Sequence, residues 1–421
     1  MSKVLVVGGG GREHAIIRKL SESKKVDKIY ACPGNGGISA YAECVNIKAS
    51  DLDSVVLFAK DYKIDMVVVA PDDPLVAGMV DALEKAGVRA FGPRANAAII
   101  EGSKVFSKNL MKKYGIPTAG YEVFSDYQSA VRYIQQKNEY PVVIKADGLA
   151  LGKGVIIAEN FEQAKQAADE IMNRHVFGKS GNKVVVEEFL TGPEVSVLAF
   201  TDGKTVKPMV SSMDHKRAYD HDKGPNTGGM GTIAPNPYYL KETADFCMDD
   251  IFLKTIQAMQ SEGRPFKGVL YFGLMLTPNG PRVIEYNCRF GDPETQVVLP
   301  LLQTDLYDIF NAVIDEKLGQ MDIQWSNNYC ACVVMASGGY PKEYKTGYEI
   351  SGLDEQGQIS GGFIYHAGTK AENGKYYTAG GRVLGVTARG ESLKEAVGNA
   401  YRLVSRISFE NQHFRRDIGT K

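Results

Sequence analysis

The chain carries the stretch Glu285-Tyr-Asn-Cys-Arg-Phe-Gly-Asp-Pro-Glu-Thr-Gln296, which crowds charged residues where the preceding sequence predicts a buried hairpin. Residues 268–277 are an apolar run, Asn279-Gly280 is a turn signal, and 282–287 predict the returning strand. Because side chains alternate across a strand, Glu285 and Asn287 face the same side and offer two neighbouring oxygen donors. Such a pair suits Mg²⁺, although an isolated pair of this kind is more often a strand-end salt-bridge cluster. The rest of the sequence decides between a metal site and a salt-bridge cluster.

The composition indicates a cytoplasmic, soluble protein of several domains. A length of 421 residues is enough for about two to four domains, and a formal charge of −1 argues against a surface that coats nucleic acid. The cysteines form no C-x-x-C pair, which favours scattered core thiols in a reducing compartment. The chain starts directly with a strand, so no signal peptide is expected, and no apolar segment has membrane-spanning length.

Residues 1–102 predict a substrate-binding domain built on a doubly wound parallel sheet. Strands are expected near 3–7, 28–31, 66–70 and 88–91, and helices near 12–22, 51–62 and 75–86. In such sheets ligands bind at the carboxyl ends of the strands. At those ends this chain has the loops 8–14, 33–37 and 71–74, which are rich in glycine, proline and small polar residues, as binding loops tend to be.

The loop Gly8-Gly-Gly-Gly-Arg-Glu-His14 opens a helix and would present backbone N–H groups to a phosphate. It does not complete a dinucleotide fingerprint, because Arg12, Glu13 or His14 occupies the third small position and no acidic residue ends the second strand. We therefore expect a site for a smaller phosphate ester, with Arg12 and Glu13 available to bind it. A glycine turn that serves only helix–sheet packing is the alternative.

Residues 103–325 are expected to form a second domain, with a subdomain at about 118–190, and residues 326–421 a third. The second domain begins with a helix containing Ser103-Lys104, followed by strands at 141–145, 155–158 and 184–189 and a helix near 161–173. A larger antiparallel sheet is expected over 190–325, with strands at 194–200 and 205–212 besides the hairpin. In the third domain, strands near 329–336, 362–367 and 382–388 precede a helix near 393–408.

Lys145 ends an apolar strand, where a buried ammonium group requires an anion. A phosphate and a nearby carboxylate are equally suitable partners. The loop that follows, Gly148-Leu-Ala-Leu-Gly-Lys-Gly154, lacks the Walker spacing, but as the turn of a hairpin it would fold over a triphosphate as a flap. Glu187-Glu188-Phe189-Leu190 ends another apolar strand, whose backbone would bind an adenine ring while Glu194 accepts from ribose hydroxyls. An ordinary solvated charge pair is the alternative there.

Residues 214–217 and 220–231 predict a polar, glycine-rich loop, with too many permissive residues for a strand and no helical period. Such a loop would wrap a small zwitterion, with Asp214 taking an ammonium group and Lys216 or Arg217 a carboxylate. His215 and His221 lack metal-ligand spacing and are expected to be non-ligands.

The order of these motifs resembles that of the ATP-grasp superfamily of carboxylate ligases. The motifs are a strand-ending lysine, a glycine flap, the Glu-Glu-Phe-Leu segment and the Glu-x-Asn pair. The segments 8–14, 214–217, 224–231 and 289–294 are similar to those of the phosphoribosylamine–glycine ligase (glycinamide ribonucleotide synthetase) family, over essentially the whole chain. The chain departs at Asp72-Asp73, where that family often has Glu-Ala, and at His221, where glycine is commoner. The resemblance implies an N-terminal doubly wound sheet, an ATP-grasp domain pair and a small β-rich C-terminal domain.

The family's reaction joins glycine to 5-phosphoribosylamine in purine (IMP) biosynthesis, with ATP cleaved to ADP and phosphate through a glycyl phosphate. It requires positioning and electrostatic stabilisation more than a covalent nucleophile. The resemblance implies that Arg289, Lys145 and Asp214 are catalytic and that Mg²⁺ or Mn²⁺ is held by Glu285 and Asn287. The implied ATP-binding residues are Lys104, Lys145, Gly152, Lys153, Gly154, Glu187, Glu188, Phe189, Leu190 and Glu194. The implied substrate residues are Gly10, Gly11, Arg12, Glu13, Asn35, Gly36 and Asp72 for phosphoribosylamine, and Asp214, Lys216, Arg289, Asp292, Pro293 and Glu294 for glycine and the acyl phosphate.

Other functions compete with this interpretation. Another ATP-grasp ligase or carboxylase, using bicarbonate or a different carboxylate, is the nearest alternative. A nicotinamide-dependent oxidoreductase is suggested only by the first glycine loop, and a catalytically dead nucleotide-binding regulator is disfavoured by the intact Lys145, Glu285, Asn287 and Arg289. We expect small-molecule partners, no nucleic acid or membrane, and a monomer, because no element shows a dimer seam.

Overall fold

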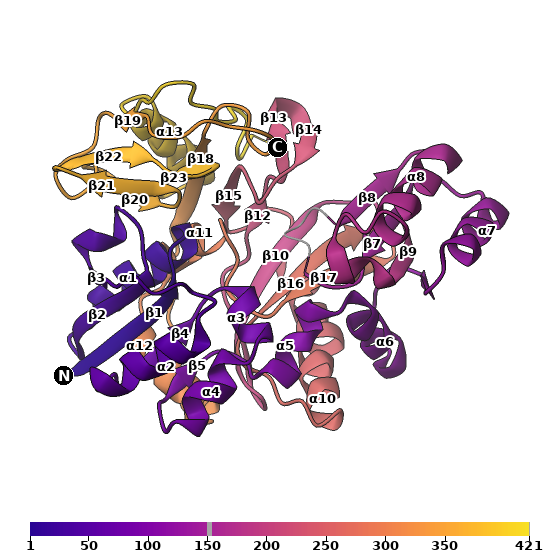
Figure 1. The fold of residues 1–421 in the computed structure, drawn as a ribbon, viewed down its shortest axis with the longest axis horizontal. Coiled ribbons are helices and arrows are strands. Elements are labelled where there is room, and N and C mark those ends of the chain that lie inside the picture. The colour runs from indigo at the N-terminus through magenta and orange to yellow at the C-terminus, as the bar shows by residue number, and fades with distance from the viewer. Residues whose placement is uncertain (150–153, 421) are drawn as a thin grey trace.

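The computed structural model describes residues 1–149 and 154–420. The N-terminal region confirms the predicted doubly wound parallel sheet, with strand order β3-β2-β1-β4-β5 (Figure 1). Its strands are β1 (Ser2–Gly8), β2 (Val26–Pro33), β3 (Glu43–Cys44), β4 (Met66–Val69) and β5 (Ala90–Phe91). Helices α1 (Gly11–Ser21), α2 (Leu52–Asp61), α3 (Asp72–Val76) and α4 (Met79–Lys85) connect or follow them. The central strands are fully buried, as parallel sheets covered on both faces are.

Two expected helices are interrupted. The helix expected over 75–86 is instead two helices, α3 and α4, which are separated at Gly78. Gly78 has a φ of +91°, a conformation that a residue without a Cβ adopts readily. The helix expected to contain Ser103-Lys104 is α5 (Ala95–Gly102) followed by α6 (Lys104–Tyr114). Ser103 caps α6 by accepting a hydrogen bond from the Phe106 N–H, a common role of serine. This break places Lys104 at the first turn of a new helix.

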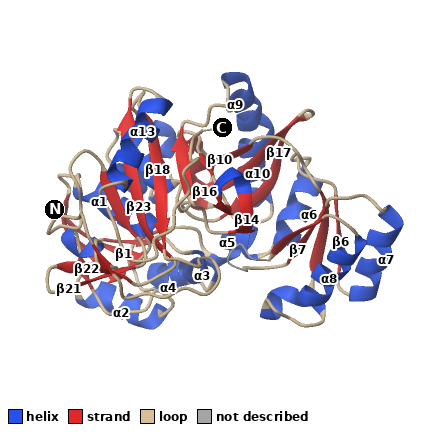
Figure 2. Ribbon diagram, turned by 90° about the horizontal axis from the view of Figure 1, so that it is seen from above, coloured by secondary structure: helices blue, strands red, loops and turns tan. Residues whose placement is uncertain are grey.

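The region 118–190 forms a lobe that projects from the rest of the molecule (Figures 1 and 2). Its sheet has the order β6-β9-β7-β8, from β6 (Tyr121–Phe124), β7 (Val142–Ala146), β8 (Val155–Ala158) and β9 (Val184–Glu188). Helices α7 (Tyr127–Lys137) and α8 (Phe161–Met172) pack with this sheet around a core of their own. Strands β7 and β8 are antiparallel neighbours, as a hairpin requires, and residues 150–153 of the loop between them lie outside the described residues.

The predicted 268–287 hairpin is confirmed as β16 (Lys267–Thr277) and β17 (Gly280–Asn287), in a sheet of order β11-β10-β16-β17. The other strands are β10 (Glu194–Asp202) and β11 (Val206–Pro208), so the strand expected over 205–212 ends early. Helices α9 (Lys241–Cys247), α10 (Leu253–Ser261), α11 (Thr295–Val298) and α12 (Leu306–Ile314) belong to the same part of the chain. Within the described residues, no helix is long and apolar enough to cross a membrane.

The antiparallel sheet expected over 190–325 is confirmed in the strands predicted for it, but the same region also contributes two strands to a C-terminal sheet. Strand β12 (Met213–Asp214) pairs with β15 (Gly231–Ala234), and β15 pairs with a C-terminal strand, in the order β12-β15-β18-β23-β20. That sheet contains β18 (Tyr329–Ala336), β20 (Phe363–His366) and β23 (Arg382–Gly390), with α13 (Leu393–Val404) packed on β18 and β23. The strands β19 (Glu349–Ile350), β21 (Thr369–Glu372) and β22 (Lys375–Thr378) form a separate small sheet. A sheet therefore joins the middle of the chain to its end.

The glycine-rich loop also contains strands that the sequence did not predict. Besides β12 and β15, β13 (Arg217–Tyr219) pairs with β14 (Lys223–Asn226). Gly224 and Gly229 have φ values of +81° and +111°, so the permissive residues supply sharp bends around short strands.

Candidate active site

A cavity of about 390 Å³ lies between the projecting lobe, the N-terminal domain and the C-terminal sheet. Its lining contains many of the residues singled out in the sequence: Arg12, Asp72, Lys104, Lys145, Gly154, Glu187, Asp214, Lys216, Glu285, Asn287, Arg289, Asp292 and Glu294. These residues are drawn from the first helix to the edge of the C-terminal sheet. The fold thus brings separate motifs to one site.

A lysine cluster, consisting of Lys104, Lys108, Lys145 and the carboxylate Glu187, forms one end of the cavity. Lys145 Nζ lies 3.0 Å from Glu187 Oε2, and Lys108 Nζ lies 2.9 Å from the same oxygen. Of the partners considered for Lys145, the structure provides the carboxylate. Burial lowers the pKa of Lys108 to about 8, although Glu187 opposes the change. One carboxylate therefore serves two buried ammonium groups.

Lys104 connects this cluster to the flap. Its Nζ donates to the Gly148 carbonyl at 2.8 Å, and burial lowers its pKa. The adjacent cap residue Ser103 donates to Asp147 Oδ1 at 2.9 Å, so the start of α6 is tied to the base of the β7–β8 turn. Gly152 and Lys153 lie outside the described residues, whereas Gly154 lines the cavity.

Glu285 and Asn287 both line the cavity, as the alternation of strand β17 predicts. Lys216 lowers the pKa of Glu285 to about 2, and its Nζ lies 3.1 Å from Glu285 Oε1. In residues 1–149 and 154–420, no group of three or more His, Cys, Asp or Glu residues has a metal-binding arrangement. A carboxylate beside an amide oxygen fits a hard cation whose coordination is completed by substrate oxygens and water, as is usual for Mg²⁺.

Arg289 is oriented by a residue that the sequence analysis missed. Its Nη2 lies 2.9 Å from Glu101 Oε1 and 3.9 Å from Asp72 Oδ2. Glu101 also accepts a hydrogen bond from the Cys288 N–H at 2.7 Å. Burial raises the pKa of Glu101 while Arg289 opposes that change, and the Arg289 Nε has no hydrogen-bond partner among the described residues. A buried acid at the end of an apolar helix was the available signal.

A mixed-charge cluster, consisting of Asp214, Lys216, Asp292, Glu294 and Arg382, forms the other end. Burial alone would lower the pKa of Lys216, but the carboxylates of Glu285 and Glu194 raise it well above its usual value. Glu194 Oε2 lies 3.6 Å from Lys216 Nζ. Desolvation, followed by the charge of Glu294, raises the pKa of Asp214. Within the described part of the chain, Asp214 Oδ1 has no hydrogen-bond partner. Both residues are available to a polar ligand.

Arg382 is a further residue that sequence reasoning missed. It is the first residue of β23, and its Nη2 lies 3.2 Å from Asp292 Oδ1. Its Nη1 donates to the carbonyl groups of Asp292 and Gly228. The C-terminal sheet thus contributes a guanidinium group to a site otherwise built from earlier parts of the chain.

Several expected ligand residues lie outside the cavity lining, among the described residues: Gly10, Gly11, Glu13, Asn35, Gly36, Glu188, Phe189, Leu190, Glu194, Arg217 and Pro293. Asn35 donates to the carbonyl groups of Gly9 and His366 and accepts from Gly37 N–H. Glu13 accepts from Gly10 N–H and from Arg12 Nε. Both side chains therefore hold the loops in shape, and their contact with substrate stays a prediction.

Known protein families match nearly the whole chain. The phosphoribosylglycinamide synthetase N domain matches residues 2–101, its ATP-grasp (A) domain residues 102–295 and its C domain residues 330–421. Together with the lysine cluster and the oxygen pair of β17, these matches define the class of the protein as an ATP-grasp ligase. More specifically, the chain belongs to the phosphoribosylglycinamide synthetase family.

Relatives and solved structures agree with this assignment. The phosphoribosylamine–glycine ligase of Caldanaerobacter subterraneus subsp. tengcongensis is 51% identical over 416 residues, 99% of each chain. A human trifunctional purine biosynthetic protein, adenosine-3, is 46% identical over 421 residues, which are 99% of this chain and 42% of that protein. The crystal structure of the Thermotoga maritima ligase has a TM-score of 0.85 at 33% identity, over 99% of this chain and 100% of that one.

A biotin carboxylase domain from Hydrogenobacter thermophilus has a TM-score of 0.76 at 17% identity, over 98% of this chain and 91% of that one, which shows a common fold alone. The resemblance drawn from the motifs is therefore confirmed at the level of the family. The protein is an ATP-dependent ligase that joins glycine to phosphoribosylamine, a step of de novo purine biosynthesis.

Proposed function

We propose that ATP binds at the lysine cluster, glycine at the mixed-charge cluster, and phosphoribosylamine beside Arg12 and Asp72. The observation that carries this arrangement is the shared carboxylate of the lysine cluster, where Lys108 and Lys145 both lie within 3.0 Å of Glu187. Cations in excess of their carboxylate partners favour a polyanion such as a triphosphate. In the mixed-charge cluster, Asp214 and Lys216 offer both signs of charge to a zwitterion.

The adenine ring would lie along the strand end 187–190, with Glu194 at the ribose and the 148–154 turn, including Gly152, Lys153 and Gly154, closing over the phosphates. Phosphoribosylamine would contact the N-terminal loops that contain Gly10–Glu13, Asn35 and Gly36. Glu285 and Asn287 would hold Mg²⁺ or Mn²⁺, which neutralises charge on the ATP phosphates. Asp292, Pro293 and Glu294 would border the glycine site.

In the first step, an oxygen of the glycine carboxylate forms a bond to the γ-phosphorus and the bond to ADP breaks. The positive charge of Arg289 would stabilise the transferring phosphoryl group, and Lys145 the phosphates behind it. Asp214 would hold the glycine amino group as an ammonium ion. An ammonium ion has no free electron pair, so the bound amino group cannot act as a nucleophile.

In the second step, the amine of phosphoribosylamine attacks the carbonyl carbon of glycyl phosphate, loses a proton and expels phosphate. Phosphate is a far better leaving group than the oxygen of a free carboxylate, which is why activation precedes amide formation. Closure of the flap would exclude water from the acyl phosphate, whose hydrolysis would waste ATP.

The test is ADP release with freshly generated 5-phosphoribosylamine, omitting ATP, glycine, phosphoribosylamine or the metal in turn. We expect turnover to require every component, with a glycinamide product identified by mass. ADP release that is indifferent to phosphoribosylamine, or that accepts bicarbonate in place of glycine, would place the chain among other ATP-grasp enzymes. Titration with Mg²⁺ and Mn²⁺ in the same assay determines the preferred ion, and light scattering tests the expected monomer.

A further inference from the structure

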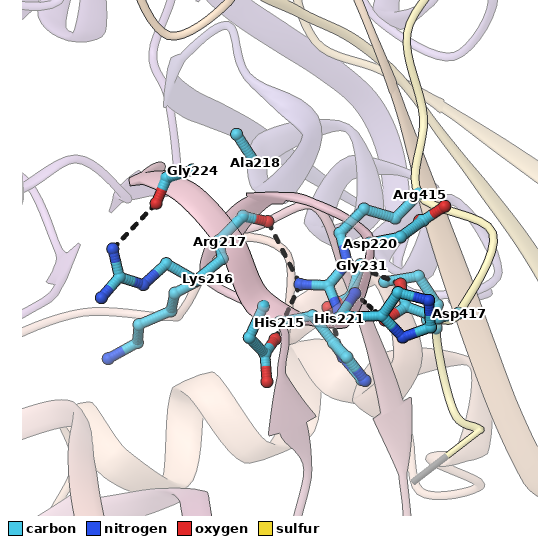
Figure 3. A network of polar contacts seen from close by, with 12 residues as sticks. His215, Lys216, Arg217, Ala218, Asp220, His221, Gly224, Gly231, Arg415 and Asp417 are labelled. Atoms are coloured by element: carbon cyan, nitrogen blue, oxygen red, sulfur yellow. Dashed lines mark hydrogen bonds and ion pairs between the residues drawn. The ribbon is translucent and has the colours of Figure 1, made fainter.

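The C-terminal segment 413–419 contacts the loop that carries Lys216 at many points (Figure 3). Arg415 is fully buried, and its Nη1 donates to the Arg217 carbonyl at 3.1 Å and to Asp222 Oδ1 at 3.0 Å. Its Nε and Nη2 donate to the two carboxylate oxygens of Asp417 at 2.8 and 2.7 Å. A single guanidinium group therefore joins the end of the chain to β13 and to the turn between β13 and β14.

The contacts continue on both sides of Arg415. Asp417 Oδ2 accepts from the His221 N–H at 2.8 Å, and Asp220 Oδ1 accepts from the Arg416 N–H at 2.7 Å. His413 Nε2 donates to the Ala218 carbonyl at 2.7 Å. His221 has a left-handed φ of +60°, so the carboxylate of Asp417 holds the N–H of a residue in an uncommon backbone conformation.

The C-terminal segment is itself fixed to the C-terminal domain. Tyr401, on α13, donates to the Arg415 carbonyl at 2.9 Å and accepts from the Ile418 N–H at 3.0 Å. The segment is therefore anchored to α13 as well as to the loop, so it can fix the position of the loop relative to α13.

The other side of the same loop faces the cavity. Lys216 adjoins Arg217 in the chain, and its side chain extends away from Arg415 (Figure 3). Its Nζ lies 3.1 Å from Glu285 Oε1. Thr227 N and Oγ1 both donate to the Lys216 carbonyl at 2.8 Å, which closes the loop on itself. Arg415 is not one of the described residues that line the cavity, so any effect on the reaction must pass through the loop.

We propose that the segment 413–419 is a clasp that holds Asp214 and Lys216 in position in the cavity, and that Arg415 is its central positioning residue. The proposal rests on the proposed function in one respect, namely that Asp214 and Lys216 bind glycine. Small displacements of a substrate-binding group reduce turnover strongly even when the altered residue is far from the reacting atoms. The clasp thereby makes use of glycine depend on the C-terminal end of the chain.

The principal test measures steady-state kinetics of Arg415→Met and Asp222→Asn. Asp222→Asn keeps the shape of the side chain and removes the charge that Arg415 binds on the loop, so it remains informative if Arg415→Met does not fold. Arg416→Met is the matched control, because Arg416 is exposed and contributes its backbone N–H to the clasp. We expect the KM for glycine to rise up to ~100-fold in Arg415→Met and less in Asp222→Asn. The KM for ATP should change less than about 2-fold, and Arg416→Met should match the unaltered protein.

Equal increases in the KM for glycine and ATP would overturn the proposal, as would a normal KM for glycine in a folded Asp222→Asn protein when Lys216→Met raises that KM. Lys216→Met separates the proposal from the assigned glycine site. If it raises the KM for glycine while the clasp variants do not, the site stands and the clasp fails. If it leaves that KM unchanged, the site assignment fails, and hydrogen exchange of residues 215–227 decides the clasp. Faster exchange in Asp222→Asn than in Arg416→Met supports it, and unchanged exchange refutes it.

Discussion

The two ends of the cavity differ in how their charges are balanced. In the lysine cluster, Lys108 and Lys145 share the carboxylate of Glu187, and burial lowers the pKa of Lys108. In the mixed-charge cluster, Lys216 is near Glu285 and Glu194, which raise its pKa despite burial. The direction of a lysine's pKa shift thus reports whether the protein itself supplies its counter-charge. A cation that the protein leaves poorly compensated indicates an anionic ligand, whereas a compensated one suits a neutral or zwitterionic ligand.

Arg289 stands between these ends, and its replacement should have the largest effect. We expect Arg289→Ala to reduce kcat by roughly 10³-fold or more, because charge on the transferring phosphoryl group would lose its nearest cation. The KM for ATP should change far less, since the lysine cluster remains. Single-turnover measurement of ADP formation is the appropriate readout. A near-normal kcat would remove Arg289 from the mechanism, and Arg264→Ala, an arginine outside the cavity lining, serves as the control.

Exchanging one lysine in each cluster should separate the two ends. Lys145→Met should raise the KM for ATP by roughly 10- to 100-fold with little change for glycine, because it removes a cation that faces the phosphates. Lys216→Met should show the reverse pattern. Steady-state kinetics with each substrate varied in turn would check both. If either variant raises both KM values equally, the cavity does not divide its ligands by charge as we infer.

Glu285→Gln tests the oxygen pair at the junction of the two ends. The substitution keeps the size of the side chain but removes its negative charge, so the concentration of Mg²⁺ at half-maximal rate should rise by about 10-fold or more. Glu84→Gln is a suitable control, because Glu84 is exposed, pairs with Arg94 and does not line the cavity. Metal dependence that is unchanged in Glu285→Gln would exclude Glu285 as a ligand.

The sequence predicted those parts of the site that depend on local pattern. The 268–287 hairpin follows from contiguous strands around Asn279-Gly280, and the alternation of β17 correctly placed Glu285 and Asn287 on the cavity. Lys108 was overlooked, although it lies four residues after Lys104 on α6 and therefore on the same helical face. That signal was present in the sequence and needed only the helix period.

Other parts could not be predicted, because they depend on pairing between distant segments. Strand β15 pairs with β18 about one hundred residues later, and nothing in its glycine-rich sequence specifies that partner. Strand β23 of the same sheet brings Arg382 beside Asp292, and the C-terminal clasp contacts the Arg217 carbonyl. Contacts of this kind arise from the assembled sheet and leave no periodic trace in either segment.

The smallest expected effect concerns stability rather than turnover. It tests whether the carboxylate of Glu187 fully compensates the positive charge of the buried Lys108. Its pKa is lowered to about 8 in the folded protein from the usual 10.5. Below pH 8 both the folded and the unfolded states hold the proton. Between pH 8 and 10.5 the folded state releases it while the unfolded state retains it, so this group's contribution to stability increases with pH.

The free energy of unfolding of the unaltered protein, minus that of Lys108→Met, should therefore rise by about 1–3 kcal/mol between pH 7 and 10. Urea unfolding at several pH values measures this difference and cancels the titration of groups common to both proteins. Lys112→Met, an exposed position on the same helix, should show a nearly flat difference. A flat difference for Lys108→Met as well would mean that Glu187 fully compensates both of its lysines. The contrast between the two ends of the cavity would then rest on Lys104 alone.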